Sequence, residues 1–478
     1  MLPDARHLET DLLVLGAGGA GLAAALAARE AGARVVVASK MGPDDPNCTV
    51  RGWGGITYAT EAHAGELFRQ VVETGGFLND QRLVEEFARQ VPRRVAALAD
   101  LGVPLEVLDE ADTRYRLGVT KIVGKGPTTG FGMTLPMRAR AEALGVRFVD
   151  HLMISTLLVE QGAVAGAAGV DLNAGRFVTL SAGATLIATG GGACLWARTD
   201  NPPGTTGDGI ALAYEAGAQL VDLECVSFTF PSSRFAELLH SGGRDPEAFL
   251  SSGGAHYFLG GIRIDERGRA TLPGLYAAGE ASGGLFGAGR LGGSALADVI
   301  VFGAIAGEEA AAFAMSHPRP QWDGAKAEQE RARLEALLTG SVPAAEVTAK
   351  LRSLMWRKCG LTKTGRSLEE AREEVALLES HRAGLGAHSV AGLREALECG
   401  FMLTLARLII SASLRREESR GAFWRLDAPE PDNARWVRNI VLRGEQGEDR
   451  LEIHPPAMTR LREPTRPRIG PGCFDYLP

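Results

Sequence analysis

The sequence has few cysteines, and their spacing pairs none of them. The chain has 478 residues, and its six cysteines lie far apart without a Cys-x-x-Cys motif: Cys48, Cys194, Cys225, Cys359, Cys399 and Cys473. Iron–sulfur clusters and structural zinc sites need closely spaced ligands, so we predict that this chain holds neither by itself. Isolated thiols of this kind are most often small buried apolar side chains.

An excess of positive charge and a long uncharged apolar run are also missing. The net charge of −7 is spread along the chain, which argues against nucleic acid or an anionic membrane surface as a partner. The apolar stretches after Gly21 and Asp298 are interrupted by Arg29 and Glu308, so no direct membrane span is expected. Because the first apolar strand begins almost at the N-terminus, without the pattern of a secretory leader, we expect a cytoplasmic protein.

What the sequence does have is glycine in two widely separated motifs. The first, Gly16-Ala17-Gly18-Gly19-Ala20-Gly21, follows the apolar run Leu12–Leu15 and opens an Ala- and Leu-rich stretch to Ala28. This order predicts a strand, a tight turn and a helix, an arrangement in which backbone N–H groups can approach a pyrophosphate. Alone the motif is weak evidence, since glycine turns between strands and helices are common.

The second motif, Pro273-Gly274-Leu275-Tyr276-Ala277-Ala278-Gly279-Glu280, repeats the pattern of a strand and a tight turn. Its Glu280 can accept hydrogen bonds from the ribityl hydroxyls of a flavin cofactor. The order and separation of the two motifs predict a two-dinucleotide-type flavoprotein with a single FAD site. Ser39 and Lys40 stand where an acid would normally bind the adenosine ribose, which weakens an NAD interpretation.

The sequence predicts an α/β fold: a two-dinucleotide-type, Rossmann-like FAD-binding domain with an antiparallel β-meander, followed by a C-terminal helical domain. The meander is expected at 152–180, before a core strand at 184–189. In the helical part, Ser367 and Glu370 have the spacing of a capping box. The predicted boundaries are 1–231 with 255–315 for the FAD-binding domain, 232–254 for a short loop, 316–435 for the helical domain and 436–478 for an irregular C-terminal tail.

Most of the chain resembles the flavoprotein subunits of succinate dehydrogenase and fumarate reductase, with L-aspartate oxidase as a close relative. The resemblance is carried, in the family's order, by Gly16–Gly21, Thr49-Val50 through Gly54-Gly55-Ile56, Ala188–Gly191, Thr206–Gly209, His256–Ile262, Gly279-Glu280 through Gly289–Ser294, and Glu418–Ala422 followed by Trp436. It implies FAD and hydride transfer at a C–C or C=C bond of a carboxylate or acyl substrate. It also implies an iron–sulfur or other electron-transfer partner, because this chain has no cluster motif.

The motifs and the resemblance together name the candidate site residues. His256 and Arg290 correspond to residues that bind the substrate carboxylate in the family and are the candidate catalytic pair. Each also has an ordinary alternative: a core histidine, and an arginine in a simple ion pair. Asp208 could equally cap the helix that follows it. The candidate cofactor-binding residues are Gly16, Gly18, Gly19, Ala20, Gly21, Ser39, Lys40, Cys48, Thr49, Gly54, Gly55, Thr189, Gly190, Asp208, Gly279, Glu280, Arg290, Ser294 and Leu296; no metal site is expected.

Three departures from the family matter. Cys48 occupies the place of the histidine that carries the flavin covalently, so FAD is expected to be non-covalent, although a thiolate could in principle attack the flavin methyl group. The segment 228–231 lacks the family's histidine, and only 23 residues, 232–254, replace its capping domain and the arginine that transfers a proton. Arg234, His240 and Arg244 are the charged candidates in this loop.

These departures leave three hypotheses for function. The leading one is an FAD-dependent oxidoreductase within a multisubunit complex. The second is an FAD-binding electron-relay or scaffold subunit without dicarboxylate turnover. The third is an enzyme like L-aspartate oxidase, against which the missing cap counts most strongly.

Overall fold

The computed structural model describes residues 6–52, 55–107, 121–125, 128–229, 253–319, 324–445 and 448–462, together with residues 2 and 322. Most of the predicted loop at 232–254, including Arg234, His240 and Arg244, lies outside these ranges, as does Gly54. The described ranges include both glycine motifs and the C-terminal helices.

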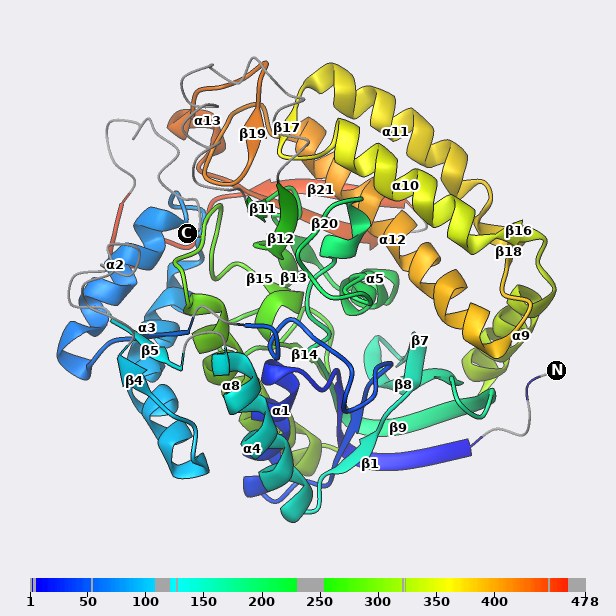
Figure 1. The fold of residues 1–478 in the computed structure, drawn as a ribbon, viewed down its shortest axis with the longest axis horizontal. Coiled ribbons are helices and arrows are strands. Elements are labelled where there is room, and N and C mark those ends of the chain that lie inside the picture. Colours follow the sequence, from blue (N-terminus) through cyan, green and yellow to red (C-terminus); the bar gives the residue numbers. More distant parts are fainter. Residues whose placement is uncertain are drawn as a thin grey trace.

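Within the described residues, a seven-stranded sheet forms the centre of the N-terminal part (Figure 1). Its parallel portion has the order β6-β2-β1-β9-β14, with bounds Arg147–Val149, Val35–Ala38, Arg6–Leu15, Arg176–Ile187 and Leu275–Ala277. All four residues of β2 are buried, as expected of a parallel strand covered on both faces. The carboxyl ends of these strands share one edge, so the glycine motifs that follow β1 and β14 meet there.

The antiparallel meander consists of β7 (Leu152–Glu160), β8 (Ala163–Asp171) and the first half of β9. The prediction of three antiparallel strands is confirmed. The expected core strand at 184–189 is not separate, however, because β9 runs unbroken to Ile187 and pairs with β14 through its last residues. One long strand therefore joins the meander directly to the parallel sheet.

Helices α1 (Gly19–Glu30) and α8 (Ser294–Ser316) pack closely against each other. A Cβ atom on Gly307 would lie only 2.3 Å from the carbonyl oxygen of Ala24, so a side chain there would force the helices apart. Each helix starts just after a glycine turn at the carboxyl edge of the sheet. Their close packing places both N-termini at the same edge.

A group of helices and a small sheet lies beside α8. Helix α3 (Gln81–Ala96) is capped by the side chain of Asp80, which accepts from the Arg82 N–H, and its 3₁₀ extension ends at Gly102 in the left-handed region. The other elements are β3 (Ile56–Tyr58), α2 (Ala64–Thr74), β4 (Glu106–Val107), β5 (Lys121–Gly124) and α4 (Thr129–Ala143). Strands β3, β5 and β4 form a three-stranded sheet in that order.

The C-terminal helices α10 (Ala344–Lys358), α11 (Gly365–Glu379) and α12 (Val390–Arg415) lie side by side, with α9 (Ala325–Thr339) near the start of α12 (Figure 1, yellow to orange). The predicted helical region is confirmed. Its predicted cap is wrong by one turn: Thr364 is the N-cap of α11, and Ser367 is the third helical residue, whose hydroxyl accepts from the Thr364 N–H. The Thr and Ser pair forms the box in place of Ser and Glu.

Among the described residues, α8 and α12 are long and apolar enough to cross a membrane, judged by length and composition alone. In α8, 56% of the most apolar window is buried inside the fold, and in α12 the figure is 78%. Core helices of globular proteins meet the same test. In this protein, α8 and α12 both pack against neighbouring helices and strands.

A second sheet, of order β15-β13-β10-β20-β21, corrects the prediction for the chain end. Residues 439–445 and 448–454 are not part of an irregular tail but form the antiparallel strands β20 (Asn439–Glu445) and β21 (Glu448–His454). The sequence prediction followed the high Arg and Pro content of the whole segment and overlooked the short buried run Ile440-Val441-Leu442, through which β20 pairs with β10.

The remaining elements are α5 (Asp208–Glu215), β10 (Leu220–Val221), β11 (Val226–Thr229), β12 (Gly254–Phe258), β13 (Gly261–Arg263), β15 (Ser282–Gly283), β16 (Val342–Pro343), β17 (Thr362–Lys363), β18 (Leu385–Gly386), β19 (Trp424–Arg425) and α13 (Asn433–Trp436).

A buried charge cluster joins α12 to this second sheet. Arg416, fully buried, donates to Glu224 at 2.7 Å and to Glu418 at 3.1 Å, and Arg420 donates to Glu418 at 2.8 Å. A buried arginine needs such compensation because its desolvation is costly. The Glu418–Ala422 motif therefore belongs to the packing of the helical part against the sheet.

Candidate functional site

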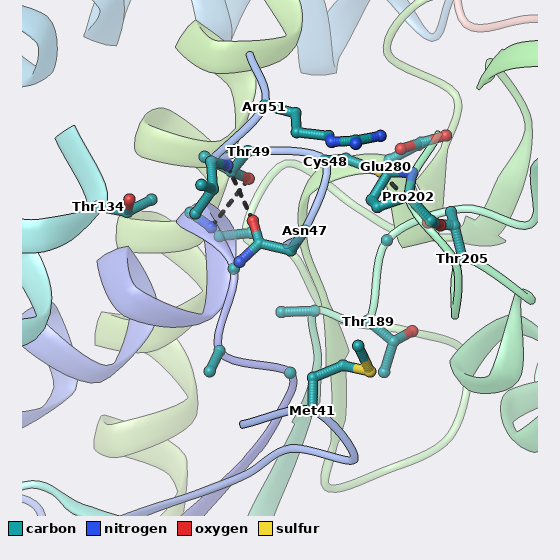
Figure 2. Close-up of a pocket in the computed structure, with 18 of the residues that line it drawn as sticks. Met41, Asn47, Cys48, Thr49, Arg51, Thr134, Thr189, Pro202, Thr205 and Glu280 are labelled. Carbon is teal, nitrogen blue, oxygen red and sulfur yellow. Dashed lines mark hydrogen bonds between the residues drawn. The ribbon is translucent and has the colours of Figure 1, made fainter. Parts of the chain in front are cut away.

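A cavity of about 810 Å³ opens at the carboxyl edge of the parallel sheet. The segments that follow β1, β2, β9 and β14 all line it, as expected at the point where an α/β sheet reverses its strand order. Figure 2 shows residues from three distant parts of the chain around it: Met41 and Cys48 after β2, Thr189 after β9, and Glu280 after β14. Its volume lies in the range of small-molecule and cofactor sites, about 300–1,000 Å³.

Two helix N-termini border this cavity. Residues 16–20 line it at the start of α1, and Gly292, Gly293, Ala295 and Leu296 line it at the start of α8. The Gly19 N–H donates to the Thr49 hydroxyl at 3.1 Å, which fixes the segment after β2 over the first turn (Figure 2). Helix N-termini carry partial positive charge and free N–H groups, so this end of the cavity suits phosphate or another anion.

The structure brings most of the predicted residues together. Of the nineteen residues predicted to bind the cofactor, Gly21, Gly279 and Ser294 do not line the cavity, and Gly54 lies outside the described residues. Ser294 is fully buried and donates to the Leu291 carbonyl at 2.6 Å. Lining the cavity are Gly16, Gly18, Gly19, Ala20, Ser39, Lys40, Cys48, Thr49, Gly55, Thr189, Gly190, Asp208, Glu280, Arg290 and Leu296, with the catalytic candidate His256.

Glu280 is the buried carboxylate of the cavity wall. One of its oxygens accepts from the Phe258 N–H at 3.0 Å. Burial raises the pKa of Glu280 to about 7, against the opposing effect of the hydrogen bond from Phe258. A half-ionised acid in this position can accept hydrogen bonds from hydroxyl groups of a ligand, as the sequence predicts.

Lys40 and Asp208 line the cavity, but their charged atoms pair with each other. The Lys40 ammonium lies 2.7 Å from carboxylate oxygens of both Asp208 and Glu398, and it donates to Thr206 at 2.7 Å. Burial alone would lower the pKa of Lys40, but the two acids outweigh it and raise the value. Asp208 does not act as the side-chain cap of α5. This network ties the end of β2 to α12.

Cys48 faces the cavity beside Glu280 (Figure 2). Its thiol donates to the Asn201 side-chain oxygen at 3.1 Å and lies 3.5 Å from the Thr205 hydroxyl. Burial, and then the negative field of Glu280, raise the pKa of the Cys48 thiol well above its ordinary value. Because the thiolate is the nucleophile, this environment disfavours a covalent link to a flavin.

Acid precipitation of the purified protein is therefore expected to release its flavin completely. The protonated Cys48 thiol offers no nucleophile, and Cys48→Ala should release the cofactor in the same way. The measurement is the flavin absorbance of supernatant and pellet after precipitation. Flavin that stays with the denatured wild-type chain, and is lost from Cys48→Ala, would show a cysteinyl link instead.

His256 and Arg290 lie together at one side of the cavity. The Arg290 Nη2 atom is 3.4 Å from His256 Nε2, and its guanidinium stacks over the Tyr257 ring at 4.4 Å. On its other side, His256 Nδ1 lies 2.7 Å from an oxygen of Asp200. Burial opposes the ionisation of Asp200, but the hydrogen bond from His256, together with the charge that His256 carries when it is protonated, holds the pKa of Asp200 below its ordinary value.

Asp200 is one of the cavity residues that sequence reasoning missed, and it contacts the candidate catalytic histidine. It lies 56 positions from His256, in an irregular segment before α5, and no periodic pattern points to it. The ordinary alternative for His256, a satisfied core histidine, fails because the side chain lines the cavity with 27% of its surface exposed. Arg290 likewise faces the cavity beside His256.

The cavity fits the predicted FAD. A Cβ atom on Gly18 would meet nothing closer than the Thr49 hydroxyl at 3.6 Å, so glycine there leaves space that the fold itself does not fill. Thr189 lines the cavity, and its buried hydroxyl has no hydrogen-bond partner among the described residues. Two N-termini for the pyrophosphate, open space at Gly18 and an acid for hydroxyl groups are the donor and acceptor set that FAD requires.

Comparison with known families agrees with this geometry. Residues 11–245 and 246–296 match the FAD binding domain, and residues 348–469 match the C-terminal domain of fumarate reductase flavoproteins. The two matches follow each other in the order of the sheet domain and the helical part. The first alone covers more than half of the chain.

Individual relatives support the same assignment. One subunit of the fumarate reductase (CoM/CoB) of Methanothermobacter marburgensis is 32% identical over an alignment that covers 91% of this chain and 97% of the relative. The fumarate reductase flavoprotein subunit of Mycobacterium tuberculosis is 29% identical, with 95% and 98% covered. The fold of the E. coli quinol fumarate reductase flavoprotein, solved as a point variant, superposes with a TM-score of 0.88 at 24% identity, over 96% of this chain and 99% of that one.

The alignment with the Methanothermobacter relative spans 531 positions, more than the 478 residues present here, so that relative has segments with no counterpart in this chain. The fold, the glycine-lined cavity and both family matches nevertheless agree from the first strand to the last helices. The chain belongs to the FAD-dependent flavoprotein family of fumarate reductases and succinate dehydrogenases.

Proposed function

We propose that this protein is the FAD-carrying subunit of a cytoplasmic oxidoreductase that transfers a hydride at a C–C or C=C bond of a carboxylate-bearing substrate. The observation that carries the proposal is the position of Arg290 and His256 in the same cavity as the glycine turns. When bound there, FAD supplies the two-electron chemistry. The chain's own residues hold it and orient the substrate.

Arg290 is built to bind a carboxylate. Its planar guanidinium offers parallel N–H groups that match two carboxylate oxygens. The Tyr257 ring below it and the Leu291 carbonyl, which accepts from Nη1 at 3.2 Å, restrict its rotation. A carboxylate fixed by Arg290 would place the adjacent carbon–carbon bond inside the cavity, away from bulk water.

Electrons must reach the flavin from another protein or a soluble donor. The described residues hold no cluster of three or more histidine, cysteine or acidic side chains suited to a metal. The relatives named above are themselves called subunits. We therefore infer that the partner is an iron–sulfur or other electron-transfer protein, and propose that the short loop at 232–254 replaces the capping domain of the family.

The test is reoxidation of the chemically reduced, flavin-loaded protein by unsaturated acids. Fumarate and crotonate, a dicarboxylate and a monocarboxylate, are expected to reoxidise the wild type measurably, but far more slowly than intact members of the family would, because the segment with the family's proton-transferring arginine is replaced here by 23 residues. Arg290→Gln should lower kcat/KM at least about a hundredfold, because a bidentate charged hydrogen bond is lost. The matched control is Arg269→Gln, an exposed arginine paired with Asp265 away from the cavity.

Equal rates for Arg290→Gln and the wild type would remove Arg290 from the substrate site. A wild type that passes electrons to a dye but to neither acid would favour the electron-relay hypothesis instead. Flavin content, measured for each variant, separates a loss of cofactor from a loss of substrate binding.

A further inference from the structure

Asp200, His256 and Arg290 form a line of three polar side chains at the cavity wall. The Asp200 carboxylate lies 2.7 Å from His256 Nδ1, and His256 Nε2 lies 3.4 Å from Arg290 Nη2. All three line the cavity. The backbone also fixes the pair, because the Asn201 side chain donates to the His256 carbonyl at 2.7 Å.

The donor and acceptor roles in this line follow from chemistry. A guanidinium has only N–H donors, so the His256 nitrogen that faces Arg290 presents its lone pair. A carboxylate only accepts, so the nitrogen that faces Asp200 carries the proton. In this arrangement His256 is the neutral Nδ1–H tautomer, and it has no proton to offer an anion on its cavity side.

An anion that binds between Arg290 and His256 favours the protonated form of His256 over the neutral one. Its oxygens need donors, and the imidazole supplies one only after Nε2 takes up a proton from solvent. The Asp200 carboxylate stabilises the resulting imidazolium through a charge-assisted hydrogen bond. The influence of His256 on the pKa of Asp200 shows that the two groups are electrostatically coupled.

The other charged groups around His256 do not replace Asp200. Arg290 disfavours an imidazolium until an anion lies between them. Glu280, on the 3₁₀ turn after β14, also feels the charge of a protonated His256, but its carboxyl group is buried and accepts a hydrogen bond from the Phe258 N–H. The Cys48 thiol is protonated. Among the described residues, Asp200, with its lowered pKa, is therefore the ionised acid that faces the imidazole at hydrogen-bond distance.

We propose that Asp200 is a positioning residue that couples carboxylate binding at His256 and Arg290 to the uptake of one proton by the imidazole. The proposal rests on the proposed function, since it assumes a carboxylate ligand. No bond other than the N–H of Nε2 forms, and the proton comes from the solvent. Affinity for the carboxylate then falls as pH rises.

Malonate is a suitable probe, because it is a dicarboxylate without adjacent methylene carbons and cannot be dehydrogenated. Calorimetric titration of the flavin-loaded protein at pH 8, in two buffers that differ in ionisation enthalpy, counts the protons taken up. The wild type is expected to take up close to one proton per malonate. Asp200→Asn should bind about tenfold more weakly at pH 8 and take up far less, as expected for the loss of one charge-assisted hydrogen bond.

Further variants isolate the role of Asp200. His256→Gln should abolish proton uptake, and Asp200→Glu should restore both affinity and uptake. Glu452→Gln is the matched control, because Glu452 pairs with His454 at 2.9 Å on β21, away from the cavity. Its titration should equal that of the wild type.

The outcomes separate the two claims. Failure of malonate to bind the wild type would count against the carboxylate substrate class and so against the proposed function. Binding without proton uptake, or an Asp200→Asn variant with unchanged affinity and uptake, would overturn the positioning role alone. Unchanged flavin content and melting temperature in Asp200→Asn would exclude misfolding as the cause of its defect.

Discussion

Replacing Gly18 with valine is expected to abolish FAD binding while the protein still folds. The residue caps α1 with φ −77°, a value open to any amino acid, and its missing Cβ would point into open space beside Thr49. A branched side chain there would occupy the place where the pyrophosphate meets the helix N-terminus. The flavin content of the purified variant should fall to background, with a circular dichroism spectrum like that of the flavin-free wild type.

Gly21 provides the contrast. A Cβ atom on Gly21 would lie 1.9 Å from the Gly16 carbonyl oxygen, inside the turn itself. Gly21→Ala should therefore damage the fold, with a lower melting temperature and poor recovery of soluble protein. A Gly18→Val variant with full flavin content would mean that the pyrophosphate does not lie on α1.

These two glycines show why so much of the fold could be predicted. Tight turns between buried strands and helices need glycine at fixed offsets, so the residues themselves record the backbone path. The parallel strands and the meander were predictable because each is marked by a local pattern, an apolar run or a turn.

Other features had no local mark. The continuity of β9 depends on partners on both sides, which only the folded sheet supplies. Strand β20 joins the second sheet by pairing with β10, which lies more than two hundred residues earlier in the chain. Thr364 and Ser367 are both residue types suited to the N-cap of α11. Thr364 is the N-cap because the helix begins at Gly365, and the sequence alone does not mark this start.

The site divides in the same way. The glycine turns, Glu280 and Arg290 were named from motifs, and the structure gathers them around one cavity. Lys40 and Asp208 were named as cofactor ligands, but they share an ion pair that no spacing predicts. Asp200 was missed because its partner is distant in sequence and its neighbours form no repeating pattern.

The stability of the protein is expected to fall as pH rises from about 5 to 8. Burial raises the pKa of Asp298 to about 8 and that of Glu280 to about 7, and burial with the nearby Glu224 also raises the pKa of Asp222. An acid with a raised pKa holds its proton in the folded state while the unfolded chain releases it. The folded state therefore binds more protons over this range, and raising the pH favours unfolding.

Asp298→Asn should remove much of this dependence. Asp298, 2% exposed on α8, does not line the cavity, and its Oδ1 atom has no hydrogen-bond partner among the described residues. Asparagine has the shape of the protonated acid without its titration. The variant should exceed the wild type by only about 1–2 kcal/mol at pH 5 and by on the order of 3–5 kcal/mol at pH 8, since each pKa unit corresponds to about 1.4 kcal/mol.

Thermal unfolding at equal flavin loading, across pH 5 to 8, measures this difference. Asp100→Asn, an exposed position at the end of the 3₁₀ turn after α3, is the control and should follow the wild-type curve. The variant is expected to be more stable than the wild type at alkaline pH because the pKa of Asp298 is raised. Above pH 8 the wild type must bury a charged carboxylate, and the variant has no such charge. A lower melting temperature for Asp298→Asn at pH 8 would show that this carboxylate is ionised and stabilised in the folded protein, contrary to its buried surroundings.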